Sequence, residues 1–174
     1  MTATITRLST PIEVDIDALA DVLIDCVEGG ASVSFMLPMT RAKATVFWQR
    51  VVADVEAGGR ILPVARDDAG IVGTVQVVLD VPENQLHRGD LAKMLVHRRG
   101  RGQGLGAALL RAAEDAAREA GTTLLVLDSV SGSDGARLYE RLGWVRVGEI
   151  PDYALWPAGG LCPTTYYYRR LGSG

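Results

Sequence analysis

A run of glycines and arginines occupies residues 98–106, with the sequence RRGRGQGLG. It stands between a predicted strand at 91–96 and a long predicted helix that begins near Leu105. The first N–H groups of a helix have no intrahelical acceptor, and the helix dipole favours negative charge at that end. Glycines let a ligand approach the backbone, and arginines add charge suited to several phosphates. The run therefore predicts a site for a phosphate-bearing ligand.

The same run partly matches two other phosphate-binding motifs. A P-loop needs Lys-Ser or Lys-Thr after its last glycine, and this chain has neither there. A dinucleotide fingerprint is matched more closely, because Gly102, Gly104 and Ala107 fit G-x-G-x-x-A and Asp128 ends the next strand. Against it, Lys93 lies in the preceding strand, and a two-helix opening with a hairpin replaces the repeated strand–helix–strand units. The dinucleotide interpretation stays open as an alternative.

The elements that must position this run follow from apolar periodicity and from the glycines, prolines and capping residues that bound each pattern. Thr10, Pro11 and Glu13 form a capping box that starts the first helix, and Gly29 ends it. The expected elements in chain order are strand 3–8, helix 11–28, helix 40–57, strands 60–66 and 71–80, strand 91–96, helix 105–120, strand 122–130, helix 134–142 and strands 144–150 and 164–169.

Strand 122–130 is almost continuously apolar, which is typical of a strand buried on both faces of a sheet. With strand 91–96 and the helix between them, it makes a unit with two parallel strands. No linker or internal repeat divides the sequence. We therefore expect a single α/β domain over residues 1–174.

The composition of the chain excludes several classes of binding partner. The chain has 174 residues, a formal charge of −3 and 20 glycines. Mild acidity without runs of like charge argues against nucleic acid and against an anionic membrane surface. The amino terminus lacks a secretory signal and no long apolar run follows, so a cytoplasmic protein is expected. Cys26, Cys162 and the two histidines fit no metal or disulfide pattern, so we expect no metal, and Cys26 is expected in the core.

Two segments resemble the GNAT acetyltransferases. Residues 101–106 are similar to the family's Arg/Gln-x-x-Gly-x-Gly/Ala motif, and residues 138–144, LYERLGW, are similar to its Leu-Tyr-Glu-Lys-x-Gly-Phe signature. The predicted order β-αα-ββ-β-α-β-α-ββ is also theirs, so the resemblance covers nearly the whole chain. It implies a mixed, mostly antiparallel sheet whose central parallel pair splays to hold acetyl-CoA. One departure is Gly132, which replaces an asparagine often found there and removes any contact of that side chain with the CoA arm.

Residues 29–36 and 147–153 are further similar to the tabtoxin-resistance acetyltransferases, which act on a small β-lactam amino-acid toxin. The resemblance implies an N-acetyltransferase that moves acetyl directly from acetyl-CoA to the amino group of a small molecule, in detoxification or antibiotic resistance. It also makes a homodimer a reasonable expectation. Two alternatives stay open: an enzyme for another amine, such as an amino acid, polyamine or protein N-terminus, and a non-catalytic module that binds acyl-CoA or a toxin.

Acetyl transfer from a thioester to an amine needs a base for the amine, a polarised carbonyl and an acid for the leaving thiolate. Tyr139 occupies the position of the family's acid. Asp128 and Asp90 are the candidate bases: Asp128 lies beside the opening if the two strands part, whereas Asp90, just before strand 91–96, needs a suitable register. A backbone N–H near Leu95 or Val96 is the expected donor to the carbonyl.

The remaining expected contacts form two groups. The residues expected to bind the cofactor are Leu95, Val96, Arg99, Arg101, Gly102, Gln103, Gly104, Leu105 and Gly106. The residues expected to bind the acceptor, from the two-helix opening and the last loop, are Ser32, Ser34, Phe35, Asp152 and Tyr153.

Overall fold

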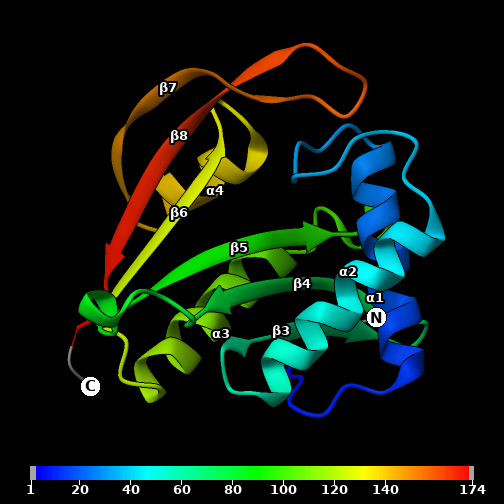
Figure 1. Ribbon diagram of the computed structural model, residues 1–174, viewed down its shortest axis with the longest axis horizontal. Helices are drawn as coiled ribbons and strands as arrows, with labels where there is room; N and C mark the ends of the chain where they lie inside the picture. Colours follow the sequence, from blue (N-terminus) through cyan, green and yellow to red (C-terminus); the bar gives the residue numbers. More distant parts are fainter. Residues whose placement is uncertain (1–2, 173–174) are drawn as a thin grey trace.

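One mixed sheet runs through the computed structural model, which describes residues 3–172 (Figure 1). Its strands are β1 (Thr4–Arg7), β2 (Arg60–Ile61), β3 (Pro63–Asp67), β4 (Gly70–Val78), β5 (Arg88–Val96), β6 (Leu124–Val130), β7 (Val145–Leu155) and β8 (Leu161–Arg170). The helices are α1 (Glu13–Glu28), α2 (Arg41–Glu56), α3 (Leu105–Glu119) and α4 (Asp134–Arg141), with short 3₁₀ turns η1 (Glu83–Gln85) and η2 (Arg98–Gly100). The sheet order is β1-β3-β4-β5-β6-β8-β7, with β2 beside β4, and β5–β6 is its parallel pair.

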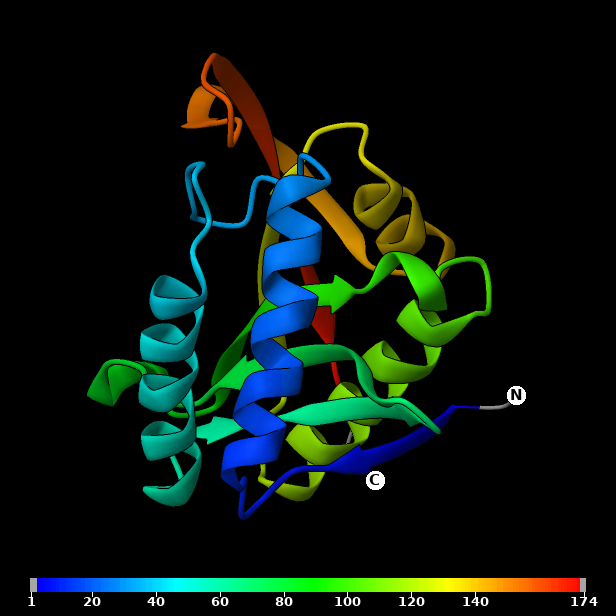
Figure 2. The ribbon, with the colours of Figure 1, turned by 90° about the vertical axis from the view of Figure 1, so that its right-hand side faces the viewer.

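Different helices cover the two faces of the sheet. Helices α1 and α2 pack on one face through a core that includes Leu19, Leu23 and Trp48. Helix α3 packs on the other face through a second core, which continues to Tyr139 of α4 (Figure 2). We call these the α1–α2 face and the α3–α4 face. Residues on β4 alternate between them, so this strand is buried from both sides.

Strands β5 and β6 part soon after they meet. Their ladder consists of three pairs and ends where Asp90 pairs with Val126. Beyond that point β6 continues against β8, whereas β5 continues against β4, and Figure 1 shows the two directions diverging. We call this divergence the fork. The fork begins at the Asp90–Val126 pair. It confirms the expectation of a central parallel pair that splays.

Strand β6 is not buried on both faces, so that prediction was wrong. Leu125 and Leu127 are buried against α3 and α4, but Val126 is half-buried and Asp128 is exposed. The helices α1 and α2 cover the β3–β4 side of the sheet and leave this face of β6 uncovered. The apolar side chains of β6 therefore indicated a parallel strand correctly and its burial incorrectly.

Local signals at the helix ends were partly right. The predicted capping box at Thr10 was wrong, because α1 begins two residues later, where Asp15 Oδ2 accepts the Ile12 N–H at 3.0 Å. Asp15 is held there by an ion pair with Arg66 of β3 at 2.6 Å, a tertiary contact that the local pattern does not contain. The cap of α2 is confirmed, since Thr40 Oγ1 accepts the Lys43 N–H at 3.2 Å. Among the described helices, none is both long and apolar enough to cross a membrane.

Candidate active site

The glycine-rich run forms the turn between β5 and α3. Gly104 caps α3 in a left-handed conformation with φ of +76°, and Gly102 has φ of +75°. Ala108 N–H is the first amide that bonds back, to Gly104 O at 3.1 Å. Within the described chain the N–H groups of residues 102–106 have no partner. Amides without partners therefore lie directly before and at a helix N-terminus, which is the setting of an anion site.

Gly100 is required by packing. A Cβ there would lie 2.6 Å from Val72 Cγ2 and 3.0 Å from Leu105 Cδ1. At Gly102 and Gly104 the space is open, and the positive φ is what favours glycine. A Cβ at Gly106 would meet Leu138 of α4 at 3.0 Å. The four glycines thus have two separate reasons, close packing at 100 and 106 and backbone conformation at 102 and 104.

Asp25 of α1 holds the arginine-rich part of this turn. Its carboxylate accepts the Arg98 N–H at 2.8 Å and also pairs with the Arg98 guanidinium. His97 Nε2 lies 3.7 Å away and an Arg101 nitrogen 3.9 Å away. Burial opposes ionisation of Asp25, but the bonds from Arg98 and the nearby positive charge outweigh it and lower the pKa. The side chain is 8% exposed, so one buried carboxylate ties three basic residues to α1.

The backbone of Val96 turns toward the fork. His97 N–H donates to Val72 O of β4 at 2.9 Å, and Leu95 pairs with Thr74 of the same strand. Because neighbouring strand residues direct their polar groups to opposite sides, Val96 presents its N–H and C=O away from β4. Its carbonyl accepts Arg101 Nε at 3.2 Å and the Cys26 thiol at 3.6 Å. The Val96 amide is therefore placed as a donor beside the glycine turn.

Asp90, Asp128 and Tyr166 share the α1–α2 face of the fork. Asp90 pairs with Val126, Asp128 follows two residues later on the same side, and Tyr166 of β8 is the cross-strand partner of Asp128. Asp90 is bound by Arg88, whereas among residues 3–172 Asp128 accepts only the Thr164 hydroxyl, at 3.2 Å. A hydrogen bond with Tyr153, burial and the charges of Asp128 and Asp90 raise the pKa of Tyr166 to about 12.

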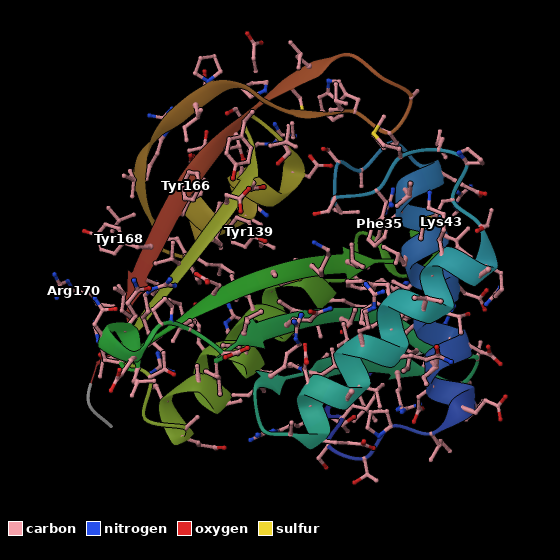
Figure 3. All side chains as sticks on the ribbon, in the orientation of Figure 1. Phe35, Lys43, Tyr139, Tyr166, Tyr168 and Arg170 are labelled. Carbon is pink, nitrogen blue, oxygen red and sulfur yellow. The ribbon has the colours of Figure 1, made fainter. Side chains whose placement is uncertain are left out.

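Tyr139 approaches the fork from α4 (Figure 3). Its ring packs 5.8 Å from that of Trp144 and 6.0 Å from that of Tyr167, and the residue is 5% exposed. Burial and the negative charge of Asp128 raise the pKa of the Tyr139 phenol, so it stays protonated at neutral pH. Its hydroxyl makes no hydrogen bond to residues 3–172, so its proton is free for a ligand.

Two segments meet over the α1–α2 face of the fork. Ser32 Oγ in the α1–α2 loop donates to Leu155 O at 2.9 Å, and Leu37 N–H donates to Pro157 O at 2.9 Å. The β7–β8 hairpin also brings Tyr153, whose hydroxyl shares a 2.8 Å hydrogen bond with Tyr166. The loop and the hairpin tip are thus joined to each other, one on each side of the diverging strands.

Comparisons with known proteins identify the family. Residues 57–146 match the model of the acetyltransferase (GNAT) domain. A protein of Azospirillum brasilense, described as an uncharacterized N-acetyltransferase in the hisH-hisA intergenic region, is 32% identical over 127 residues, which is 72% of this chain and 74% of the relative. The chain belongs to the GNAT acetyltransferase family.

Solved GNAT structures share the whole fold. A putative acetyltransferase, yncA, from Salmonella typhimurium, solved with acetyl-CoA, has a TM-score of 0.78 at 18% identity, covering 100% of this chain and 96% of its own. A phosphinothricin acetyltransferase from Sinorhizobium meliloti, also solved with acetyl-CoA, has a TM-score of 0.79 at 19% identity, covering 100% of this chain and 91% of its own. The expected fold class is confirmed.

The expected enzyme class, an acetyl-CoA-dependent N-acetyltransferase, is confirmed by the GNAT family. The chain's own residues fit the cofactor, because the amides of residues 102–106 are free and a side chain at Gly100 or Gly106 would press on its neighbours. Among the described residues, no three His, Cys, Asp or Glu side chains gather where they could hold a metal ion.

Three of the residues predicted to bind a ligand differ in what they contact in the structure. Arg99 points to the β3–β4 turn, where it pairs with Asp67 at 3.2 Å and donates to Ile71 O at 3.1 Å. Phe35 packs edge-on against Phe47 with ring centroids 5.2 Å apart. Asp152, with φ of +54°, lies in an irregular stretch of β7 and has no polar partner among the described residues. Their roles stay predictions.

Three residues of the site were missed by sequence reasoning: Asp25, Lys93 and Tyr166. Asp25 sits one residue before Cys26 in a helix pattern, where a lone acid is not informative. Lys93 was taken only as an argument against a dinucleotide fold, although a lysine inside an apolar strand is itself a signal. Asp90 proved to be the third residue of β5 and not a residue before it, and that register brings it to the fork.

Proposed function

We propose that this enzyme transfers acetyl directly to the amino group of a small molecule, and that the acceptor is a β-lactam amino-acid toxin or antibiotic of the tabtoxinine type. Direct transfer is supported by the Asp128 charge that acts on the Tyr139 phenol and by the Val96 backbone, which faces away from β4 and accepts Arg101 of the glycine turn. The acceptor class is supported by the resemblance of residues 29–36 and 147–153 to tabtoxin-resistance enzymes.

Each group has a defined task. Acetyl-CoA, when bound at residues 102–106, supplies the acetyl group as a thioester with an electrophilic carbonyl carbon. The Val96 N–H donates to the carbonyl oxygen. Asp128 accepts the proton of the acceptor amine, directly or through a water, because a free amine is mostly protonated at neutral pH. Tyr139, held protonated by burial and by Asp128, gives its proton to the leaving thiolate.

Direct transfer is favoured because neither cysteine suits a covalent step. Cys26 and Cys162 are buried and free. Burial raises the pKa of the Cys26 thiol, which keeps it protonated and weakly nucleophilic. A small acceptor is favoured by the bond between the α1–α2 loop and the hairpin tip, since Ser32 and Leu155 join across the face from which the acceptor enters.

The test is release of free CoA thiol from acetyl-CoA with a panel of amines that includes tabtoxinine-β-lactam, amino acids, polyamines and a peptide with a free amino terminus. We expect amine-dependent release that is fastest with the β-lactam amino acid. Tight acetyl-CoA binding with no acceleration by any amine would favour the non-catalytic alternative. Fastest release with a polyamine or the peptide would overturn the acceptor class and leave the transfer chemistry intact.

A further inference from the structure

Lys93 is a charged group of the fork that acetyl transfer does not use. Strands β4 and β5 pair Thr74 with Leu95 and Gln76 with Ala92, so Lys93 and Met94 lie opposite the single residue between Thr74 and Gln76. This bulge gives Lys93 a left-handed backbone with φ of +51°. Met94 then packs on the α3–α4 side, whereas Lys93 turns to the α1–α2 face. The bulge is what delivers the lysine to the acceptor side.

The ammonium group there lacks a carboxylate partner. Nζ donates to Ser34 Oγ at 3.0 Å, and within residues 3–172 no carboxylate lies within ion-pairing distance of it. Arg60 and Arg88, on the same face, each have an aspartate. Burial lowers the pKa of Lys93, and Asp128 is close enough to oppose that effect without forming a pair. A half-buried cation bound only to a hydroxyl is costly unless a ligand supplies the missing charge.

Two further observations fall at the same place. Ser34 and Lys93 are two of the three non-glycine residues with positive φ in the described chain, at +78° and +51°, and their side chains bond to each other. Such strained conformations persist where surrounding structure enforces them, and they cluster at functional sites. Beside them, Gln76, the cross-strand neighbour of Ala92, is fully buried and its Nε2 has no partner among the described residues.

We propose that Lys93 and Ser34 bind a carboxylate of the acceptor while Asp128 faces its amine, so that the enzyme selects amines that carry a carboxylate close by. Lys93 has two N–H donors left after its bond to Ser34, and the Ser34 hydroxyl proton is free to donate. Lys93 on β5 is positively charged and Asp128 on β6 is negatively charged. The two side chains are therefore complementary to the carboxylate and the ammonium group of an amino acid. The inference rests on the proposed function, because it assumes that the amine lies at Asp128.

The kinetic test compares amino acids with their decarboxylated amines in the wild type and in Lys93→Met. For the carboxylated acceptor, Lys93→Met should raise KM at least tenfold and change kcat less than threefold. With the decarboxylated amine, Lys93→Met should have the same kcat and KM as the wild type. Lys93→Arg should keep part of the preference for the carboxylated acceptor. Arg50→Met, which removes an exposed charge on α2, is the matched control. An equal loss with both acceptors would overturn the proposal and leave the transferase function standing.

A binding test needs no turnover. Lys43 and Lys93 are the two lysines of the chain, so incorporation of lysine labelled with ¹³C at Cε, which leaves all three N–H donors of each ammonium group in place, gives each a separate NMR signal. The Lys93 signal is the one absent from Lys93→Arg. Adding a carboxylated acceptor should shift the Lys93 signal and leave Lys43 in place, and the decarboxylated amine should shift neither. A Lys93 signal that does not move, or that moves equally with both, would overturn the carboxylate site even if no amine proved to be a substrate.

Discussion

Two phenols lie side by side in the core, with ring centroids 6.0 Å apart, and differ in what their hydroxyls do. Tyr167 donates to Glu140 at 3.0 Å, so its proton already has a use in the fold. Tyr139 has no such bond within the described residues, and its pKa is raised by burial and by Asp128. A buried phenol with a free proton suits a proton donor, and the neighbouring phenol provides a natural control.

Replacing Tyr139 with Phe should lower kcat by about 100-fold or more, the usual size of a lost general acid. The Kd for acetyl-CoA should change less than about twofold, since the glycine turn is untouched. Stopped-flow or steady-state thiol release and calorimetric binding measure the two quantities. Tyr167→Phe should keep kcat and lose about 1 kcal/mol of folding stability through its hydrogen bond. If both variants lose the same activity, Tyr139 acts through packing and not as the acid.

Asp128 and Asp90 likewise differ in whether a partner in the fold already binds the side chain. Asp90 is bound to Arg88, whereas Asp128 accepts a single hydroxyl and acts on Tyr139, Tyr166 and Lys93. We expect Asp128→Asn to lower kcat/KM by about 100-fold near neutral pH and Asp90→Asn to lower it far less. The Asp128→Asn loss should shrink as pH rises toward the pKa of the amine, because the acceptor then loses its proton without help. The reverse ranking in pH profiles of the two variants would assign the base to Asp90.

These residues were accessible from sequence to different degrees. Tyr139 and the glycines were identified because each sits in a short motif whose chemistry is local. Asp128 was found through the strand pair, but its advantage over Asp90 depends on the Asp90–Val126 register. Lys93 could not be placed, because a bulge decides which face it points to and leaves no turn residue in the sequence to mark it.

At the scale of elements, the fork is made by what each strand pairs with. Strand β5 is held to β4 and β6 to β8, and the two share three residue pairs. Sequence patterning predicted the order of elements well, because periodicity and helix-ending glycines are local. It made strand 144–150 too short, since β7 extends to Leu155 with a register shift that its partner β8 allows. Burial of β6 was misjudged because it depends on where α1 and α2 end.

Helix α1 also acts on the glycine turn, through Asp25. We expect Asp25→Asn to raise the KM for acetyl-CoA about 3–10-fold with little change in kcat, because Arg98 and Arg101 lose the charge that positions them. The lowered pKa of Asp25 means that its ionised form stabilises the fold above the ordinary value of about 3.9, and that this contribution disappears as pH falls through the lowered value.

Unfolding followed from pH 7 to pH 2 should therefore show a gap of about 1–3 kcal/mol between wild type and Asp25→Asn at neutral pH that closes in acid. Asp21→Asn, on an exposed turn of the same helix where Asp21 pairs with Arg41, is the matched control and should leave the KM unchanged. A KM increase of equal size in both variants would mean that general charge, and not the Arg98 contact, governs cofactor binding.

At the scale of the whole molecule, the two ends of the sheet differ in how fully they are covered. Strands β3 and β4 lie between α1, α2 and α3, and the cores on both sides are closed. Strands β6 and β8 pack against α3 and α4 on one face and are less covered on the other, and β7 is exposed along most of its length on both faces. Stability is thus concentrated in one half, and the other half can carry polar groups that reduce it.

Lys93 is the residue at which the loss of folding stability caused by a partly buried charge can be measured. Because burial lowers its pKa, the unfolded chain holds the proton more tightly than the folded one, and stability rises with pH between the lowered pKa and the ordinary value of about 10.4. Below that window the folded protein carries the full cost of the charge. Lys93→Met should therefore raise Tm at neutral pH, by about 2–4 °C for each kcal/mol regained, and the gain should fade above pH 10. Calorimetry of both proteins at pH 7 and 10.5 tests it, and a variant less stable than wild type at pH 7 would show that Ser34 and Asp128 more than offset the burial of the ammonium.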